Sequence, residues 1–293
     1  VATADDATAM YWNPSGLALM RRPELLVNHT KWLADIDYTY MGLALPMGNA
    51  GTVGLAVTAM TMGEMQVTAY GVEGDFTGET FKAGSYAVSV SYARSLTDRF
   101  AIGGSAKIIT ETIEQASARG LAIDIGTLFR TPFKGVRLGV SMSNFGTKMQ
   151  MSGDALLMRA DIDPTQAGNN ESVNAELSTD QFDLPLLMRV GLAKDIINSD
   201  FMRLTMAIDG MHPNDNTEYV NTGFEMTFRL LGGSAAVRGG LKSLFMADVG
   251  EKIALGGGLA LPIAGGVQLY ADYAMESWPH LNYVHKYSLR LAF

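Results

Sequence analysis

The sequence predicts an all-β fold, a transmembrane antiparallel β-barrel of about fourteen strands with a short N-terminal helical segment in its lumen. Three observations support this prediction. Apolar and polar side chains alternate in one segment after another, short and long links alternate between those segments, and the last strand ends on an aromatic residue. Barrels of the bacterial outer membrane have these features.

The last strand, residues 283 to 293, has two chemically different faces. One face carries Tyr287, Leu289, Leu291 and Phe293. The other carries Lys286, Ser288 and Arg290. Successive side chains of a strand point to opposite sides, so one side of this strand is apolar and the other is polar and solvated. We interpret it as the closing strand and assign its four apolar residues to barrel assembly.

Similar segments recur along the chain and predict the other strands. Charged residues within them share a face with small polar ones, which places the charges in the lumen and not against lipid. The expected strands lie near residues 24–33, 36–47, 51–63, 83–96, 99–112, 120–131, 135–145, 184–195, 201–211, 217–229, 233–242, 251–261, 265–275 and 283–293.

The links between these segments give an independent test. Links after even-numbered strands are short, such as Gly48-Asn49-Ala50 and Thr97-Asp98. The two large loops, Glu64 to Lys82 and Gly146 to Asp183, follow odd-numbered strands. Since such barrels have short periplasmic turns and longer external loops, both chain ends are expected on the periplasmic side.

Composition excludes several other classes of protein. A net charge of -8 argues against nucleic-acid binding, and the absence of cysteine excludes thiolate metal sites. His285 and Ser288 point to opposite faces of one strand and cannot form a catalytic dyad. We therefore expect no enzyme activity and no cofactor.

The charged residues expected in the lumen carry both signs. Mixed charge is typical of a paired, filled interior and not of an ion-selective pore lined by one sign. These residues are Lys107, Asp124, Arg130, Arg137, Arg189, Glu225, Arg238, Asp272, Lys286 and Arg290.

Residues 1–22 do not alternate and are expected to form short helical turns. Asp5 and Asp6 can cap a helix that ends at Asn13-Pro14, and Ser15 can cap a second turn. Two stretches here, Ala4-Asp5-Asp6-Ala7 and Tyr11-Trp12-Asn13-Pro14-Ser15-Gly16-Leu17-Ala18, resemble the N-terminal signature of the PorV/PorQ family of outer-membrane proteins. That family is related to the FadL-type channels for hydrophobic compounds.

The resemblance implies a hatch folded inside the barrel, and hence a hatch at 1–22 and a barrel at 23–293. Its implied hatch residues are Asp5, Asp6, Tyr11, Trp12, Asn13, Pro14 and Gly16. Further similar stretches are Leu184-Pro185 with Arg189-Val190-Gly191, Arg238-Gly239-Gly240, Asp272-Tyr273-Ala274 and the motif His212-Pro213-Asn214-Asp215-Asn216-Thr217-Glu218.

The last of these motifs is expected to form an external turn. Four oxygen-bearing side chains, of Asn214, Asp215, Asn216 and Glu218, could hold calcium. The same residue types also build tight Asx turns, so both interpretations stay open. The acidic loop 146–183 is either a solvated loop or a docking surface for a partner.

Two functions follow from the resemblance. A PorV/PorQ-type barrel implies a non-enzymatic component of type IX secretion, embedded in outer-membrane lipid, whose partner is another secretion component or an exported protein. A FadL-type barrel implies a hatch-gated channel that takes up hydrophobic small molecules. The first predicts a filled lumen and the second a continuous apolar tunnel.

Overall fold

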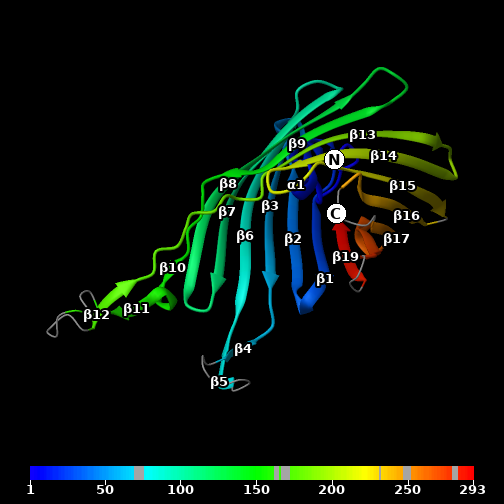
Figure 1. The fold of residues 1–293 in the computed structure, drawn as a ribbon. Coiled ribbons are helices and arrows are strands. Elements are labelled where there is room, and N and C mark those ends of the chain that lie inside the picture. Colours follow the sequence, from blue (N-terminus) through cyan, green and yellow to red (C-terminus); the bar gives the residue numbers. More distant parts are fainter. Residues whose placement is uncertain (69–75, 162–164, 166–171, 231, 247–251, 279–282) are drawn as a thin grey trace.

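The computed structural model describes residues 1–293 apart from 69–75, 162–164, 166–171, 231, 247–251 and 279–282, and shows a closed barrel (Figure 1). Fourteen antiparallel strands form the ring. They are β1 (Glu24–Lys31), β2 (Asp37–Pro46), β3 (Thr52–Thr61), β6 (Ala83–Ser95), β7 (Phe100–Ile113), β8 (Ala116–Arg130), β9 (Arg137–Gly146), β13 (Leu187–Asn198), β14 (Met202–Pro213), β15 (Tyr219–Leu230), β16 (Gly233–Leu244), β17 (Lys252–Pro262), β18 (Gln268–Glu276) and β19 (Val284–Ala292). Short 3₁₀ turns lie at Leu33–Asp35 (η2), Gly48–Ala50 (η3), Asp154–Leu156 (η4) and Ala264–Gly266 (η5).

The ring closes where the first strand meets the last. β1 pairs with β19 from Glu24 opposite Ala292 to Lys31 opposite His285. Phe293 donates its backbone N–H to Pro23 at 3.0 Å beside this seam. The predicted fold class is confirmed, and each of the fourteen expected segments corresponds to one strand of the ring. The C-terminus lies at the end of the barrel with the short links, which we call the short-turn end; the opposite end is the long-loop end. Val1 is buried inside the lumen, where its ammonium group lies 3.0 Å from Asp209 of β14.

The two faces of the wall differ as alternation predicts. On β6, Tyr86, Val88 and Val90 are exposed on the outside, whereas Ser91 is buried inside. The apolar face of β19 also points outward, with Tyr287, Leu289 and Phe293 about half exposed. An exposed apolar band around a closed barrel is compatible with lipid as the surrounding solvent.

The structure differs from the prediction at the long-loop end. β7 and β8 are joined by Glu114 and Gln115 alone, so β8 begins four residues earlier than expected. The two large loops contain strands: β4 (Met65–Thr68) pairs with β5 (Phe76–Phe81), and β11 (Leu157–Ala160) pairs with β12 (Val173–Glu176). A two-residue strand, β10 (Ser152–Gly153), joins the edge of β8. Figure 1 shows both hairpins projecting away from the barrel.

The N-terminal segment lies inside the barrel. It contains a four-residue helix, α1 (Ala9–Trp12), and a 3₁₀ helix, η1 (Pro14–Leu19). Ala7, Met10 and Leu17 are buried against Leu26 and Ala56 of the wall. Within the described ranges, no helix is long and apolar enough to cross a membrane.

The caps of these helices differ from those expected. Thr8 is the N-cap of α1 without a side-chain bond, and Asp6 instead accepts hydrogen bonds from the N–H and hydroxyl of Thr8. Asn13 caps η1, accepting from the N–H of Ser15 at 3.2 Å. Ser15 is therefore a donor to the cap and not the cap itself. The Asn13 amide accepts at the cap through its oxygen and donates through its nitrogen to the carbonyl of Thr127 on β8.

We expect a charge on the outer face to destabilise the barrel. Val88 lies near the middle of β6 with 53% of its surface exposed, and Leu96 lies in a short turn with 58% exposed. Val88→Lys should cost about 2–4 kcal/mol in a lipid bilayer, and Leu96→Lys only about 0–1 kcal/mol, because the cost depends on depth. Denaturant unfolding in lipid vesicles measures both. Equal costs for the two variants would contradict the assignment of a membrane band.

Candidate functional site

The N-terminal segment is fixed to one wall of the barrel by a row of inward-facing glycines. Gly103, Gly126, Gly139 and Gly191 lie on the adjacent strands β7, β8, β9 and β13. A Cβ on Gly103, Gly126 or Gly139 would collide with the N-terminal segment; on Gly103, for example, it would lie 2.5 Å from the carbonyl carbon of Pro14. A Cβ on Gly191 would collide with the Asp209 carboxylate and lie 3.1 Å from the Cβ of Val1. These glycines therefore allow a close backbone approach.

Asn13 is the central anchor of this contact. Its side chain is fully buried and donates to the carbonyl of Thr127 on β8 at 3.1 Å and to that of Val1 at 3.4 Å. Its oxygen accepts from the Ser15 hydroxyl at 2.7 Å. Next to it, the Ser141 hydroxyl of β9 donates to the Trp12 carbonyl at 3.0 Å. Buried amides are costly unless bonded, so these contacts specify one position for the segment.

Two neighbouring residues of the predicted hatch show the same close packing. Pro14 lies against Gly103, and a Cβ on Gly16 would collide with the carbonyl of Ala4. On the next strands, the side chain of Met10 occupies the space left by Gly42 and Gly54. The contact with the wall thus extends from β2 round to β13.

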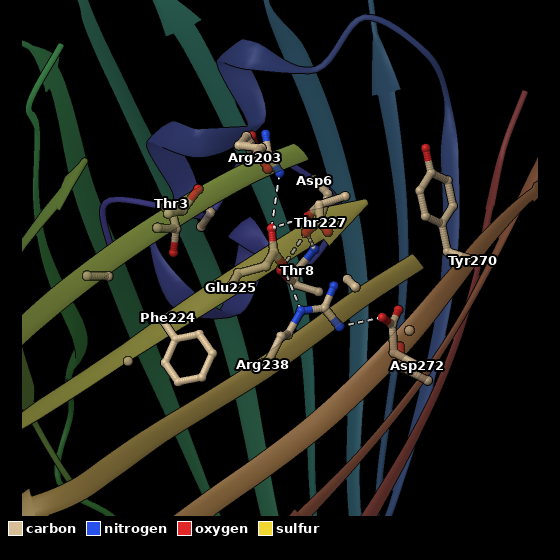
Figure 2. A pocket seen from close by; sticks show the side chains of 18 of the residues that line it. Thr3, Asp6, Thr8, Arg203, Phe224, Glu225, Thr227, Arg238, Tyr270 and Asp272 are labelled. Carbon is tan, nitrogen blue, oxygen red and sulfur yellow. Dashed lines mark hydrogen bonds and ion pairs between the residues drawn. The ribbon is translucent and has the colours of Figure 1, made fainter. Parts of the chain in front are cut away.

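The opposite wall, β14 to β19, leaves a cavity of about 630 Å³ beside the N-terminal segment. Figure 2 shows this cavity, with Thr3, Asp6 and Thr8 of the segment on one side and strand residues on the other. Arg203, Glu225 and Arg238 lie in those halves of their strands that are nearer the short turns, and Asp272 lies at the middle of β18. The cavity therefore lies in the short-turn half of the lumen.

A chain of ion pairs crosses the cavity wall. Glu225 of β15 contacts Arg203 of β14 at 3.0 Å and Arg238 of β16 at 2.7 Å. Arg238 also donates to Asp272 of β18 at 2.5 Å (Figure 2). That last bond passes over β17 at Gly258, where a Cβ would collide with the Asp272 carboxylate. The missing side chain lets two strands that are not neighbours share an ion pair.

Most of the other predicted lumen charges are also paired. Lys107 contacts Asp124 at 2.8 Å, Arg137 contacts Asp195 at 2.9 Å, and Arg290 contacts Glu24 at 2.7 Å. Lys286 contacts the buried Glu276 at 2.7 Å. Arg189 donates to the Ser143 hydroxyl at 3.1 Å and lies over the Trp12 ring at 5.8 Å. Arg130 is different: it is exposed at the short-turn end of β8, where its backbone N–H bonds Arg99.

The two acidic residues of the segment have different surroundings. Asp6 lies 3.5 Å from the Arg290 guanidinium. Asp5 faces the cavity but is enclosed by the barrel, and this desolvation, followed by repulsion from Asp6, raises its pKa. The arginines across the cavity oppose that shift. Asp5 thus retains its negative charge less readily than an aspartate in water.

The long-loop side of the N-terminal segment is aromatic. Tyr11 and Trp12 are 43% and 45% exposed, and their rings meet edge to face at 4.9 Å. Tyr11 also contacts Tyr40, 6.0 Å away on β2, and Trp12 lies over Arg189 at the long-loop end of β13. We call Tyr11, Trp12 and Tyr40 the aromatic cluster. The segment therefore has an aromatic side and a charged side.

The motif 212–218 forms a turn in the structure. Asn214 donates to the carbonyl of Leu184 at 3.1 Å, and Asn216 accepts from the N–H of Thr217 at 2.8 Å. Hydrogen bonds from its own N–H and from His212 hold the pKa of Glu218 below its usual range. Pro213 ends β14, and Asp215 is exposed in the turn. In the part of the chain that the structure describes, no group of three or more histidine and acidic residues could hold a metal ion.

The list of lumen charges expected from the sequence leaves out five partners. Arg203, Asp195, Glu24, Lys242 and Glu276 complete ion pairs with expected residues or with one another. Arg203 shares the polar face of its strand with Thr205, which was a usable signal. Glu24 and Glu276 lie at strand ends, where alternation is weakest. In the acidic loop, Asp163 and Glu171 lie outside the described residues.

Comparison with known proteins identifies the fold. No protein-family model matches the chain, and no curated protein matches it. The CymD monoaromatic hydrocarbon channel is similar with a TM-score of 0.61 and 10% identity, over 98% of this chain and 92% of that one. A Pseudomonas aeruginosa FadL homologue is similar with a TM-score of 0.60 and 11% identity, over 100% of this chain and 95% of that one. The Ralstonia pickettii toluene transporter TbuX is similar with a TM-score of 0.56 and 11% identity, over 98% of this chain and 92% of that one.

At this level of identity the similarity shows a shared fold. The barrel is FadL-like, which supports the FadL-related part of the resemblance found in the sequence. The PorV/PorQ part stays a prediction.

The glycine row can be tested with a single methyl group. Gly126→Ala places a Cβ against the Asn13 side chain and should weaken docking of the N-terminal segment by about 2 kcal/mol, as overpacking does. Gly210→Ala is the matched control, because its Cβ would lie 3.8 Å from the nearest atom. Limited proteolysis of the folded barrel measures release of the segment. Equal cleavage rates in the two variants would show that the row does not hold the segment.

Proposed function

We propose that this chain is a non-enzymatic outer-membrane channel for small hydrophobic molecules, with its N-terminal segment as a plug and both chain ends on the periplasmic side. The aromatic cluster carries the proposal. Tyr11 and Trp12 present half-exposed aromatic rings toward the long-loop end, inside a barrel whose cavity is lined largely by charged and small residues. Exposed apolar surface in a concave setting is typical of a ligand-binding site.

The fold supports the same assignment. The structures most relevant to it are named as a monoaromatic hydrocarbon channel and a toluene transporter. Small aromatic molecules can stack on tyrosine and tryptophan rings, so they are the substrate class we propose. The plug then carries the aromatic cluster and borders the charged cavity, which Trp12 also lines.

The lumen does not match either sequence expectation fully. The N-terminal segment fills part of it, and the cavity beside the segment is charged and not an apolar tunnel. An apolar solute must therefore leave the aromatic cluster by a displacement of the segment, or bypass the charged cavity. The secretion role stays a prediction from the PorV/PorQ resemblance, and we rank it second because no comparison supports it.

Toluene uptake by cells that express the full chain tests the proposal. Trp12→Ala should lower the uptake rate about five-fold, the equivalent of one aromatic contact of about 1 kcal/mol. Tyr86→Ala, which removes an aromatic ring from the outer face, should leave uptake unchanged.

Two results would contradict the channel proposal. One is uptake no faster than in cells without the barrel. The other is a stoichiometric secretion component or exported protein that co-purifies in mild detergent, combined with uptake that Trp12→Ala does not alter. The second result would favour the secretion role.

A further inference from the structure

A second cavity continues the first along the same wall. It has a volume of about 360 Å³ and shares Arg238, Gly239, Asp272 and Ser288 with the larger cavity. Its lining comes from β1 and β16 to β19 and includes no residue of the N-terminal segment. The two cavities together therefore run past the segment on the side opposite the glycine row.

Small side chains keep this second cavity open. Gly240, Ala254, Gly256 and Ala274 all line it. Ala274 is opposite Lys286 in the β18–β19 register, and Ala254 is opposite Glu276 in the β17–β18 register. Larger residues at these inward positions would fill the space, so the wall that carries the cavity is built from residues that leave it vacant.

A charged cluster lies at the long-loop end of the second cavity. Glu276, only 2% exposed, accepts from Lys242 of β16 at 2.6 Å and from Lys286 of β19 at 2.7 Å. Just beyond it, the Lys252 ammonium lies 3.3 Å from the centre of the Trp278 ring, which meets Trp32 at 5.3 Å. In the part of this end that the structure describes, the route is bordered by charged and aromatic side chains and not by the N-terminal segment.

Charges of both signs alternate along the whole route. Arg203, Glu225, Arg238 and Asp272 are followed by Lys286, Glu276 and Lys242. The charged groups can replace part of the hydration shell of an ion or a polar solute, whereas small residues, Leu255 and Tyr273 supply most of the rest of the second cavity's lining. With no ring of one sign, the route selects weakly between cations and anions.

We propose that the wall formed by β16 to β19 carries a second, polar permeation path for inorganic ions and small hydrophilic solutes. The path passes beside the N-terminal segment while that segment stays docked. It meets the aromatic cluster only at Trp12, which also lines the first cavity. Since it would carry polar solutes, it goes beyond the uptake of hydrophobic molecules and does not depend on it. The Lys242–Glu276–Lys286 cluster is its narrow end.

Ion conductance of the purified full chain in planar lipid bilayers tests the path. In potassium chloride, the folded barrel should carry a steady current, and Ala274→Phe should reduce that current about five-fold or more by filling the second cavity. Ala271→Phe, on the outward face of the same strand, is the matched control and should leave the current unchanged. Toluene uptake should be the same in both variants, which separates this test from that of the hydrophobic channel.

Cysteine labelling gives a readout that does not depend on current. The chain has no cysteine, so single introduced thiols can be followed cleanly. Ser288 lines both cavities, whereas Ser91 is 1% exposed, on an inward position of β6. Ser288→Cys should react with a charged methanethiosulfonate reagent, and Ser91→Cys should not. Adding Ala274→Phe should slow labelling of Ser288→Cys from the long-loop side.

Three results would overturn the proposal. The first is no current above the bare bilayer from barrels shown to be folded by their gel mobility. The second is the same current in Ala274→Phe and wild type. The third is equal labelling of Ser91→Cys and Ser288→Cys, because the route would then follow displacement of the N-terminal segment and not the β16–β19 wall.

Discussion

The close contact between the N-terminal segment and the glycine row determines how the lumen is divided. A backbone can lie directly on a sheet only where the sheet has no side chains. Four adjacent strands meet this condition because each has an inward-facing glycine, at Gly103, Gly126, Gly139 and Gly191. The segment is therefore held against one side of the barrel. The remaining space lies along β14 to β19, beside the ion pairs of Arg203, Glu225, Arg238 and Asp272.

The charges on that second wall are tolerated because they are paired. An isolated ion in the lumen would lack both water and a partner, whereas Glu225 has Arg203 and Arg238, and Arg238 also has Asp272. Gly258 of β17 also matters here, because its missing side chain lets Arg238 of β16 reach Asp272 of β18 across the strand between them. Small residues thus position the segment on one wall and the ion pairs on the other.

The strands could be predicted from the sequence because their faces differ in chemistry at a period of two. That pattern places Val88 outside and Asp124 inside without any knowledge of neighbours. Contacts across the barrel could not be predicted in this way: Arg238 and Asp272 are 34 residues apart, and their bond depends on a glycine in a third strand. The cap at Asn13 was missed because its amide is recruited by Thr127, a partner 114 residues away. The β11–β12 hairpin was missed because its strands are too short to show alternation.

Glu24 connects three parts of the chain that meet only in the finished barrel. One of its carboxylate oxygens accepts from the backbone N–H of Ala7 at 2.9 Å, and the other accepts from Arg290 at 2.7 Å. The first bond belongs to the N-terminal segment, the second to the last strand, and Glu24 itself begins the first strand. Arg290 reaches Glu24 only after β19 has paired with β1, so docking of the segment is completed by the same event that removes the free edges of the sheet. In assembly terms, this carboxylate links the filling of the barrel to its closure.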